Sequence, residues 1–261
     1  MFREGGFLLG VSLDGTRELH DCLRRDAPGQ PTCDRVTANI ARLRAAGIPC
    51  NILCVVDNRV AARSGEVFRE LRQHGYLQFI SCLDPLDAAA PGALFPEAYG
   101  RFLSETFRLY ARAFRENRYV SVRLFDNWIN MFCGAQPECC GLSVRCTPQF
   151  LVESNGDVYP CDFFALDRWR MGNLNTESFF RLEKSEAAVR FLESGAARVA
   201  ACRTCKWDFL CHGGCRRDRD HCGVPGDNRL CAGLSAFFNQ CFPELATLSR
   251  LPPHSPPRLR P

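Results

Sequence analysis

The chain has 261 residues, of which 46% are hydrophobic and 24% charged. These fractions are typical of a globular protein, and the length allows one large domain or a domain with a smaller appendage. The net charge of +4 is too small to indicate nucleic-acid binding, and no basic run with interleaved aromatic residues occurs. We expect the dipeptide Arg216-Arg217 to lie on a solvated loop.

The amino-terminal stretch MFREGGFLLGVSLDG has only a short apolar run before it turns polar. This is the pattern of neither a secretory signal nor a membrane span, so no membrane association is predicted. Seventeen cysteines without an export signal indicate a reducing, cytoplasmic compartment and favour metal binding over disulfides. Because the count is odd, the cysteines cannot all pair within one chain.

The first half of the chain alternates apolar runs with amphipathic segments. Strands are predicted at 7–13, 52–56, 77–83 and 119–125, and helices at 34–46, 62–74 and 96–116. Short connections between strand and helix indicate parallel βα units whose strands are covered on both faces. Three or four such units are too few for a closed eight-stranded barrel. A first strand at residue 7 would also present an open apolar edge.

From about residue 133, cysteine, glycine and turn residues replace the helical periodicity. The segment 149–161 (QFLVESNGDVYPC) is predicted as a hairpin with Asn155-Gly156 at its turn. A helix is expected to begin at Ser185 or Glu186, whereas 202–231 has so little periodicity that bound metal must stabilise it. The expected domains are therefore 1–130, 131–250 and a disordered proline-rich tail at 251–261.

Seven cysteines follow the pattern C-x9-G-x4-C, C-x2-C-x5-C-x3-C, C, and an eighth stands six residues before the first. They are Cys140, Cys146, Cys161, Cys202, Cys205, Cys211, Cys215 and Cys231. Thiolates at short fixed intervals suit a soft metal or an iron–sulfur cluster, and eight would hold two four-ligand clusters. Structural zinc is the main alternative, but the C-x5-C-x3-C run exceeds the usual zinc spacing and favours two [4Fe–4S] clusters.

The remaining cysteines do not fit this spacing. Cys50, Cys54 and Cys82 lie in apolar runs and are predicted to be small core residues. Cys139 could compete with its neighbour Cys140 for the ligand role. The others are Cys22, Cys33, Cys133, Cys222 and Cys241.

Several segments give the sequence a family resemblance. The cysteine pattern resembles the SPASM domain of radical S-adenosylmethionine (SAM) enzymes. The stretch 140–174 (CGLSVRCTPQFLVESNGDVYPCDFFALDRWRMGNL) resembles the anaerobic sulfatase-maturating enzymes, and VSLDG, ELHD and NILCVVD upstream resemble the same family. The resemblance spans residue 2 to about 250. It implies an α/β fold: the C-terminal part of a radical SAM partial (βα) barrel, lacking its first strands, followed by a cysteine-rich, loop-dominated SPASM domain.

The resemblance also implies roles for individual residues. Cys140, Cys146, Cys161 and Cys215 would hold one auxiliary [4Fe–4S] cluster, and Cys202, Cys205, Cys211 and Cys231 the other. Ser12 and Arg24 would bind SAM, and a hydroxyl and a guanidinium both suit a ligand carboxylate. Leu83 would pack against SAM, although an apolar residue there also suits the core. Asp162 would be the general base, against the plainer interpretation as a turn residue, because a negatively charged cluster favours the protonated form of a neighbouring carboxylate.

One part of the radical SAM pattern is absent. The C-x3-C-x2-C triad that would bind the SAM-cleaving [4Fe–4S] cluster does not occur, since Cys50 and Cys54 are not followed by a third cysteine three residues on. A GGEP-like segment is missing as well. The family places both before the strand at residue 7. We therefore expect an N-terminally truncated enzyme that is inactive as this chain alone.

The implied reaction oxidises a cysteine or serine of a sulfatase to Cα-formylglycine. SAM cleavage would give methionine and a 5′-deoxyadenosyl radical that abstracts a Cβ hydrogen, Asp162 would remove the thiol or hydroxyl proton, and the surplus electron would leave through the auxiliary clusters. The implied partners are the sulfatase polypeptide and a low-potential donor such as ferredoxin or flavodoxin, with the enzyme itself monomeric. A SPASM peptide maturase making another modification, such as a thioether crosslink, and a non-catalytic electron-transfer module remain alternatives.

Overall fold

The computed structural model describes residues 2, 4–85, 92–118, 120–196, 199–220 and 226–251. Its contacts divide the chain into two compact units, one formed by Met1–Ala135 with Leu230–Pro261 and the other by Gln136–Arg229. Cys222 and residues 252–261 lie outside the described residues, so the predicted disordered tail remains a prediction. In the described part, no helix has both the length and the apolar character needed to span a membrane.

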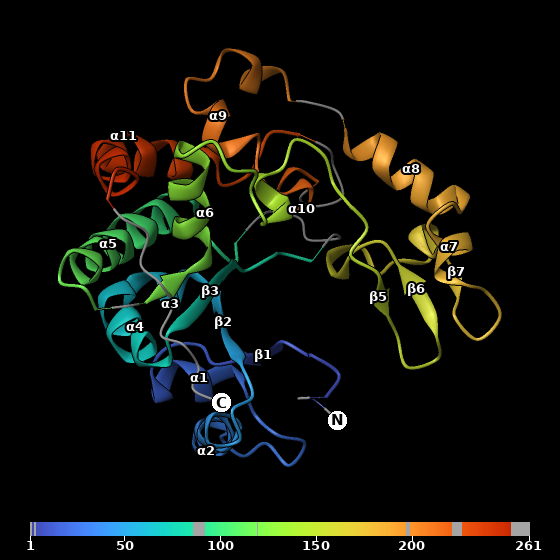
Figure 1. Ribbon diagram of the computed structural model, residues 1–261, viewed down its shortest axis with the longest axis horizontal. Helices are drawn as coiled ribbons and strands as arrows, with labels where there is room; N and C mark the ends of the chain where they lie inside the picture. Colours follow the sequence, from blue (N-terminus) through green and yellow to red (C-terminus); the bar gives the residue numbers. More distant parts are fainter. Residues whose placement is uncertain are drawn as a thin grey trace. The chain divides into compact units, whose positions relative to one another are not determined.

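The first unit contains a four-stranded parallel sheet in the order β1-β2-β3-β4, of which Figure 1 labels the first three strands. The strands are β1 (Leu9–Ser12), β2 (Cys50–Val56), β3 (Tyr76–Ser81) and β4 (Ser121–Val122). Residues on one face of β2 are buried, whereas those on the other face are only partly buried, so the cover expected on both faces is complete on one. Within the described residues β1 is an edge strand, and the exposed Phe7 and Leu8 precede it. The predicted parallel sheet and its open apolar edge are confirmed.

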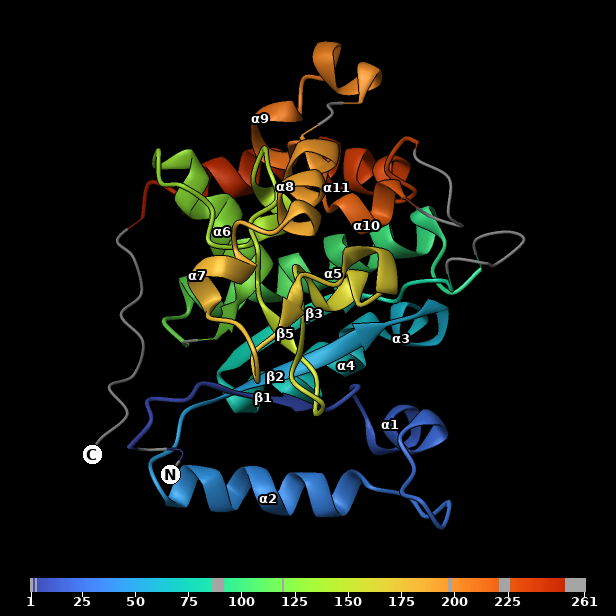
Figure 2. The ribbon, with the colours of Figure 1, turned by 90° about the vertical axis from the view of Figure 1, so that its right-hand side faces the viewer.

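The helices of the first unit connect and cover these strands. They are α1 (Arg17–Leu23), α2 (Cys33–Ala45), α3 (Asn58–Ala62), α4 (Ser64–Leu71), the 3-10 turn η1 (Arg72–His74), α5 (Pro96–Arg115), α6 (Arg123–Phe132) and α11 (Cys231–Leu248). Figures 1 and 2 show α2 beside β1 and β2, with which it makes contact. Helix α5 contacts α3, α4 and α11.

One strand prediction in this unit was wrong, and one helix was missed. The strand expected at 119–125 is only Ser121–Val122, because Phe125, Trp128 and Ile129 repeat at helical spacing and are buried on α6. Helix α1 was not predicted at all. Its start is fixed by Thr16, whose hydroxyl accepts a hydrogen bond from the backbone N–H of Leu19.

Helix α11 belongs to the first unit, although it comes from the end of the chain. Its Phe237 ring packs against Trp128 at 4.9 Å and Phe107 at 5.6 Å between ring centroids. Gly100 on α5 and Gly233 on α11 meet backbone to backbone, since a Cβ on Gly233 would lie 2.0 Å from the carbonyl oxygen of Pro96. The compact units therefore differ from the predicted domains at 1–130 and 131–250: α11 groups with the sheet and its helices.

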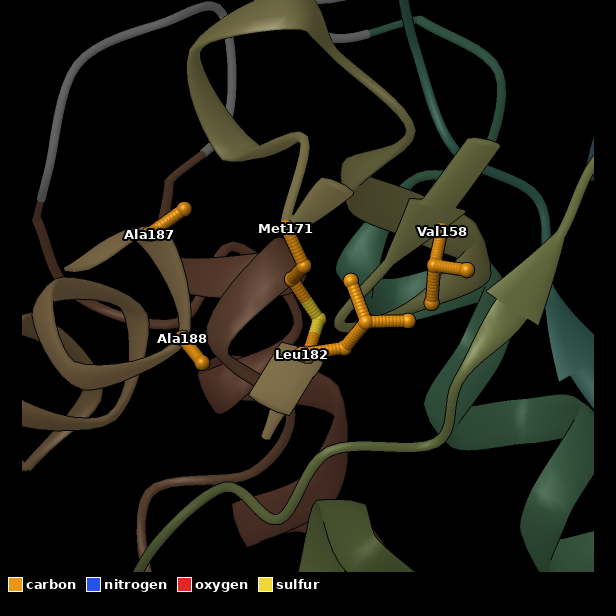
Figure 3. Packing of buried hydrophobic residues seen from close by; sticks show 5 residues of the cluster. All are labelled: Val158, Met171, Leu182, Ala187 and Ala188. Atoms are coloured by element: carbon orange, nitrogen blue, oxygen red, sulfur yellow. The ribbon is translucent and has the colours of Figure 1, made fainter. Parts of the chain in front are cut away.

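The second unit is loop-rich and has a small core. Its strands are β5 (Leu151–Val152), β6 (Asp157–Tyr159) and β7 (Gly172–Asn173), and its helices are α7 (Phe179–Leu182), α8 (Glu186–Gly195), α9 (Asp208–Cys211) and α10 (Arg216–Arg219). The described part of this unit also has the 3-10 turns η2 (Cys140–Leu142), η3 (Asp162–Phe164), η4 (Asp167–Trp169) and η5 (Ala200–Thr204). Val158, Met171 and Leu182 converge in its core beside Ala187 and Ala188 (Figure 3).

The predicted hairpin and helix of this unit are confirmed. Strands β5 and β6 pair antiparallel, and Gly156 takes the left-handed conformation at their turn (φ +88°). Strand β7 adds a third strand that the sequence did not indicate. Helix α8 begins after Ser185, whose hydroxyl accepts from the N–H of Ala188. The predicted solvated loop at Arg216-Arg217 was wrong: both side chains are buried, on α10.

Candidate functional site

A cavity of about 610 Å³ opens where the carboxyl ends of β1, β2 and β3 meet. Asp14, Val55 and Cys82, each at or just beyond the end of one of these strands, line it together with side chains of α1 and α3. This is the edge at which parallel α/β sheets bind ligands, and the volume suits a small organic molecule. The cavity lies entirely within the first unit.

Asp14 is the centre of a buried polar network at this edge. Its carboxylate accepts hydrogen bonds from Arg24 Nε at 2.7 Å and from the backbone N–H of Val55 at 2.8 Å. Its own N–H donates to Nδ1 of the buried His20 at 3.2 Å. Asp14 thereby ties the end of β1 to β2 and holds the Arg24 guanidinium at the cavity wall.

A second set of polar groups lines the cavity from α3. Asp57 caps this helix by accepting from the N–H groups of Arg59 and Val60, and it also binds the Arg59 guanidinium at 2.7 and 2.9 Å. Arg59 Nη1 in turn donates to the exposed Cys22 thiol at 3.0 Å. With charges of both signs on its wall, the cavity is suited to a zwitterionic ligand such as an amino acid derivative.

The three predicted SAM-binding residues fall at this edge of the sheet, and one lines the cavity. Arg24 ends α1 and is a lining residue. Ser12 is the last residue of β1, and Leu83 follows the end of β3 by two positions, next to the lining residue Cys82. Sequence reasoning missed Asp14, Asp57 and Arg59, although Asp57 directly follows a buried strand, the position at which such folds carry ligand-binding groups.

Three of the four cysteines predicted for the first cluster are close enough within the second unit for their thiols to interact electrostatically. The thiols of Cys140 and Cys161 both act on Cys215, whose pKa is raised mainly by burial and then by the charge of Asp218. Gly141, next to Cys140, packs at Cys215: a Cβ on this glycine would lie 3.5 Å from Cys215 Cβ. Segments separated by more than fifty residues along the chain therefore bring these thiols together.

Cys161 and Asp162 are in direct contact. The Cys161 thiol donates to Asp162 Oδ1 at 3.3 Å, and the same oxygen accepts from the N–H of Phe163 at 3.0 Å. Burial raises the pKa of the Cys161 thiol to about 12, helped by this bond to the carboxylate. The carboxyl group of Asp162 is itself exposed.

Cys146 is the fourth member of the first set. Burial raises the pKa of its thiol, and the charges of Arg216 and Arg219 oppose this effect. Its sulfur lies 3.5 Å from the position that a Cβ on Gly195 would occupy, so the absence of a side chain at the end of α8 leaves room for it.

The second predicted set is only partly assembled within one unit. In the second unit, Cys202 lies in η5, Cys205 directly follows it, and Cys211 ends α9. A Cβ on Gly213 would lie 3.5 Å from the Cys202 sulfur, so this glycine leaves room for it. The backbone N–H of Trp207 donates to the Cys205 sulfur at 3.4 Å. Cys231 begins α11 in the first unit, and its assignment to this set stays a prediction.

The donor chemistry of the first set fits an iron–sulfur cluster. Among the sixteen cysteines that the structure describes, no two form a disulfide, and the set presents sulfur alone. Among the described residues, no three His, Cys, Asp or Glu side chains converge as tightly as one metal ion requires. A four-iron cluster is larger than a single ion, so its sulfur ligands stand farther apart.

The other described cysteines separate into core and surface positions. Cys50 and Cys54 are buried in β2, as predicted, whereas Cys82 is partly exposed and lines the cavity. Cys33 and Cys241 are buried on helices, and Cys22 and Cys133 are exposed. Cys139 is partly buried and precedes η2.

Comparison with known proteins gives the second unit a family description. Residues 140–206 match the SPASM family, described as an iron–sulfur cluster-binding domain. The match contains the first three cysteines of the predicted first set and two of the second.

Relatives similar to nearly the whole chain carry one kind of name. A cysteine-type anaerobic sulfatase-maturating enzyme of Clostridium novyi is 33% identical over 256 residues, covering 95% of this chain and 68% of the relative. The enzyme of the same name from Clostridium perfringens (strain 13) is 35% identical, covering 94% and 68%. A serine-type anaerobic sulfatase-maturating enzyme of Klebsiella pneumoniae is 29% identical, covering 96% and 63%.

Solved structures show the same likeness in three dimensions. One titled native anSMEcpe with bound AdoMet and Kp18Cys peptide has a TM-score of 0.89 and 34% identity, covering 95% of this chain and 70% of that one. Another, native anSMEcpe with bound AdoMet, has a TM-score of 0.88 at the same identity. The expected α/β architecture, with a partial radical SAM barrel and a SPASM domain, is thereby confirmed.

Proposed function

Because this chain belongs to the anaerobic sulfatase-maturating enzymes, which are radical SAM oxidoreductases, we propose that it oxidises a cysteine or serine of a sulfatase to Cα-formylglycine. One observation supports this most strongly. The chain combines the SPASM cysteine pattern with a cavity at the carboxyl edge of the sheet whose wall carries charges of both signs. The sequence contains no C-x3-C-x2-C triad, so the reaction requires one to be supplied with this chain.

The cavity is the proposed SAM site. Arg24, which Asp14 holds at the cavity wall, would bind the carboxylate of the methionyl group. Ser12 adds a hydroxyl at the end of β1, and Leu83 an apolar contact beyond β3. When bound, SAM would supply the radical that removes a Cβ hydrogen, and auxiliary clusters would supply a path for the electron left behind.

Asp162 is the proposed general base. Its exposed carboxylate can approach a substrate thiol or hydroxyl, and its Oδ1 already accepts a hydrogen bond from a thiol in the protein, that of Cys161. Ligation of Cys161 to a cluster requires loss of the thiol hydrogen, which would free this oxygen to accept a proton from the substrate. The bond from the N–H of Phe163 would keep the carboxylate oriented.

The cysteines are the proposed cluster ligands, in the two sets given above: Cys140, Cys146, Cys161 and Cys215, and Cys202, Cys205, Cys211 and Cys231. With four thiolates each, the sites leave no iron open for SAM and suit electron transfer. The proposed partners are a sulfatase polypeptide and a low-potential donor such as ferredoxin or flavodoxin, and the proposed state is a monomer.

The proposal is tested with a chimera that adds a C-x3-C-x2-C segment from the Clostridium perfringens relative ahead of this chain. With SAM, dithionite and a sulfatase-derived peptide, we expect 5′-deoxyadenosine and an aldehyde on the peptide, detected by mass spectrometry. The chain alone is expected to produce neither. A crosslinked peptide instead of the aldehyde would support a different SPASM maturase, and 5′-deoxyadenosine from the chain alone would contradict the need for the triad.

The role of Asp162 is tested in the same chimera. Asp162→Asn should slow aldehyde formation at least about 100-fold, because general-base catalysis contributes on that order, while leaving SAM binding intact. Asp167→Asn is the matched control, an exposed carboxylate a few residues away on η4, and should leave the rate unchanged. Equal rates for Asp162→Asn and Asp167→Asn would rule out the base assignment.

A further inference from the structure

Arg216 is a buried cation enclosed by aromatic rings. Arg216 is only 7% exposed. The central carbon of its guanidinium lies 4.9 Å from the ring centroid of Phe164, 5.0 Å from that of Trp169 and 4.8 Å from that of Phe191. The sequence placed this arginine on a solvated loop, and nothing in the proposed reaction uses it. Such a position is costly for a charge unless it is well compensated.

Polar contacts fix the guanidinium in this cage. Its Nη1 donates to the carbonyl oxygen of Phe191 at 2.8 Å, and its Nε donates to Asp220 Oδ2 at 3.0 Å. The guanidinium group of an arginine stays charged in proteins even when it is buried. The second unit therefore holds a permanent positive charge at a defined point, with Asp220 as its counter-charge.

This point lies beside two of the predicted cluster ligands. Arg216 directly follows Cys215 in the chain. Its Nη1 and the sulfur of Cys146 each lie 3.5 Å from the position that a Cβ on Gly195 would take, so the two atoms are at most twice that distance apart.

A purely structural role for Arg216 is the plainer alternative. The cage of three rings could, however, be filled by an apolar side chain without the cost of burying a charge, and such replacements are often neutral or stabilising. A cation kept at this cost, within a few ångströms of two thiols that would carry negative charge, indicates an electrostatic role toward them.

We propose that Arg216 tunes the reduction potential of the iron–sulfur site that Cys140, Cys146, Cys161 and Cys215 would hold, an inference that rests on the proposed function. Reduction adds a negative charge to such a site. A fixed guanidinium nearby stabilises the reduced form more than the oxidised one, and in a low-dielectric interior this effect is large. Arg216 therefore raises the potential of this site, and Asp220 lowers it.

The test measures midpoint potentials in the full chain carrying Cys202→Ser and Cys205→Ser, so that only the first set remains complete. After anaerobic reconstitution with ferrous iron and sulfide, a redox titration is followed by electron paramagnetic resonance. Arg216→Met, which keeps an unbranched stem but removes the charged guanidinium, should shift the midpoint to lower potential. Asp220→Asn should shift it to higher potential. Opposite shifts from two residues that contact each other would not follow from a packing defect.

Two controls complete the test. Arg216→Lys keeps the charge and should lie closer to the parent than Arg216→Met does. Arg190→Met removes a half-exposed arginine that also lies over the Trp169 ring, at 6.0 Å, and should leave the midpoint unchanged. If Arg216→Met takes up no iron, the midpoint potential of Asp220→Asn alone tests the proposal. Unchanged midpoints, or shifts of the same sign in Arg216→Met and Asp220→Asn, would overturn the proposal. A parent chain that takes up no iron and sulfide would instead refute the proposed function.

Discussion

Asp14 shows how single residues fix the geometry of the cavity. Its N–H donates to His20 Nδ1, so the hydrogen of the neutral ring is on Nε2, which donates to the Thr32 hydroxyl at 3.1 Å. That hydroxyl donates in turn to the backbone carbonyl of Arg24 at 2.6 Å. Burial lowers the pKa of His20, which favours this neutral form. Arg24 is thus held at both its backbone and its guanidinium, as a ligand-binding side chain requires.

Replacing Asp14 tests this network. Asp14→Asn removes the buried charge that pairs with Arg24 and turns an acceptor into a donor, so the free energy of unfolding should fall by about 2 kcal/mol. Urea denaturation of the chain measures this change. The matched control is Asp34→Asn in the exposed Arg17–Asp34 pair, which should change the stability by no more than about 0.5 kcal/mol. Equal losses in Asp14→Asn and Asp34→Asn would contradict the buried network.

At the scale of elements, the contact between α5 and α11 depends on glycine. A Cβ on Gly233 would lie 2.0 Å from a backbone carbonyl oxygen of α5, which no rotamer change relieves. Gly233→Ala should therefore push the helices apart and lower the free energy of unfolding by about 2 kcal/mol, despite the better helix propensity of alanine. Gly92→Ala, at a position with nothing within 4 Å of an added Cβ, is the control and should be nearly neutral. Thermal unfolding of both variants measures the difference.

The turn η1 gives the first unit a pH-dependent stability. Burial, and then the charge of Arg44, lower the pKa of His74 from 6.5 to about 4. Between these values the unfolded chain binds a proton that the folded chain does not, so stability falls as the pH drops below about 6.5. Between pH 7 and pH 5 the native protein should lose about 2 kcal/mol more than His74→Gln. Identical pH profiles in chemical denaturation would show that His74 does not titrate in this way.

Across the whole molecule, the elements with a regular apolar pattern were predictable from the sequence. The features that depend on contacts with residues far away in the chain were not. The strands were predictable because their apolar runs are continuous, as in β2. Helix α11 was not, because it is apolar nearly all round and its burying partner, α5, lies more than a hundred residues earlier. The burial of Arg216 was equally hidden, since its cage is assembled from η3, η4 and α8.

The candidate sites follow the same division. The cysteine spacing identified the ligand candidates because short intervals impose proximity by themselves. The polar network around Asp14 escaped prediction, since a hydrogen bond between β1 and the end of β2 joins residues forty-one positions apart. The spacing of the cysteines predicts which thiols can lie close together, whereas the charged groups around them are known only from the three-dimensional structure.

Metal analysis of the anaerobically reconstituted full chain tests whether the eight cysteines hold two iron–sulfur clusters. We predict about eight iron and eight sulfide per chain, with a brown absorbance, and about half of each in the Cys202→Ser/Cys205→Ser variant. Stoichiometric zinc without sulfide in the purified chain, retained after reconstitution, would contradict this prediction.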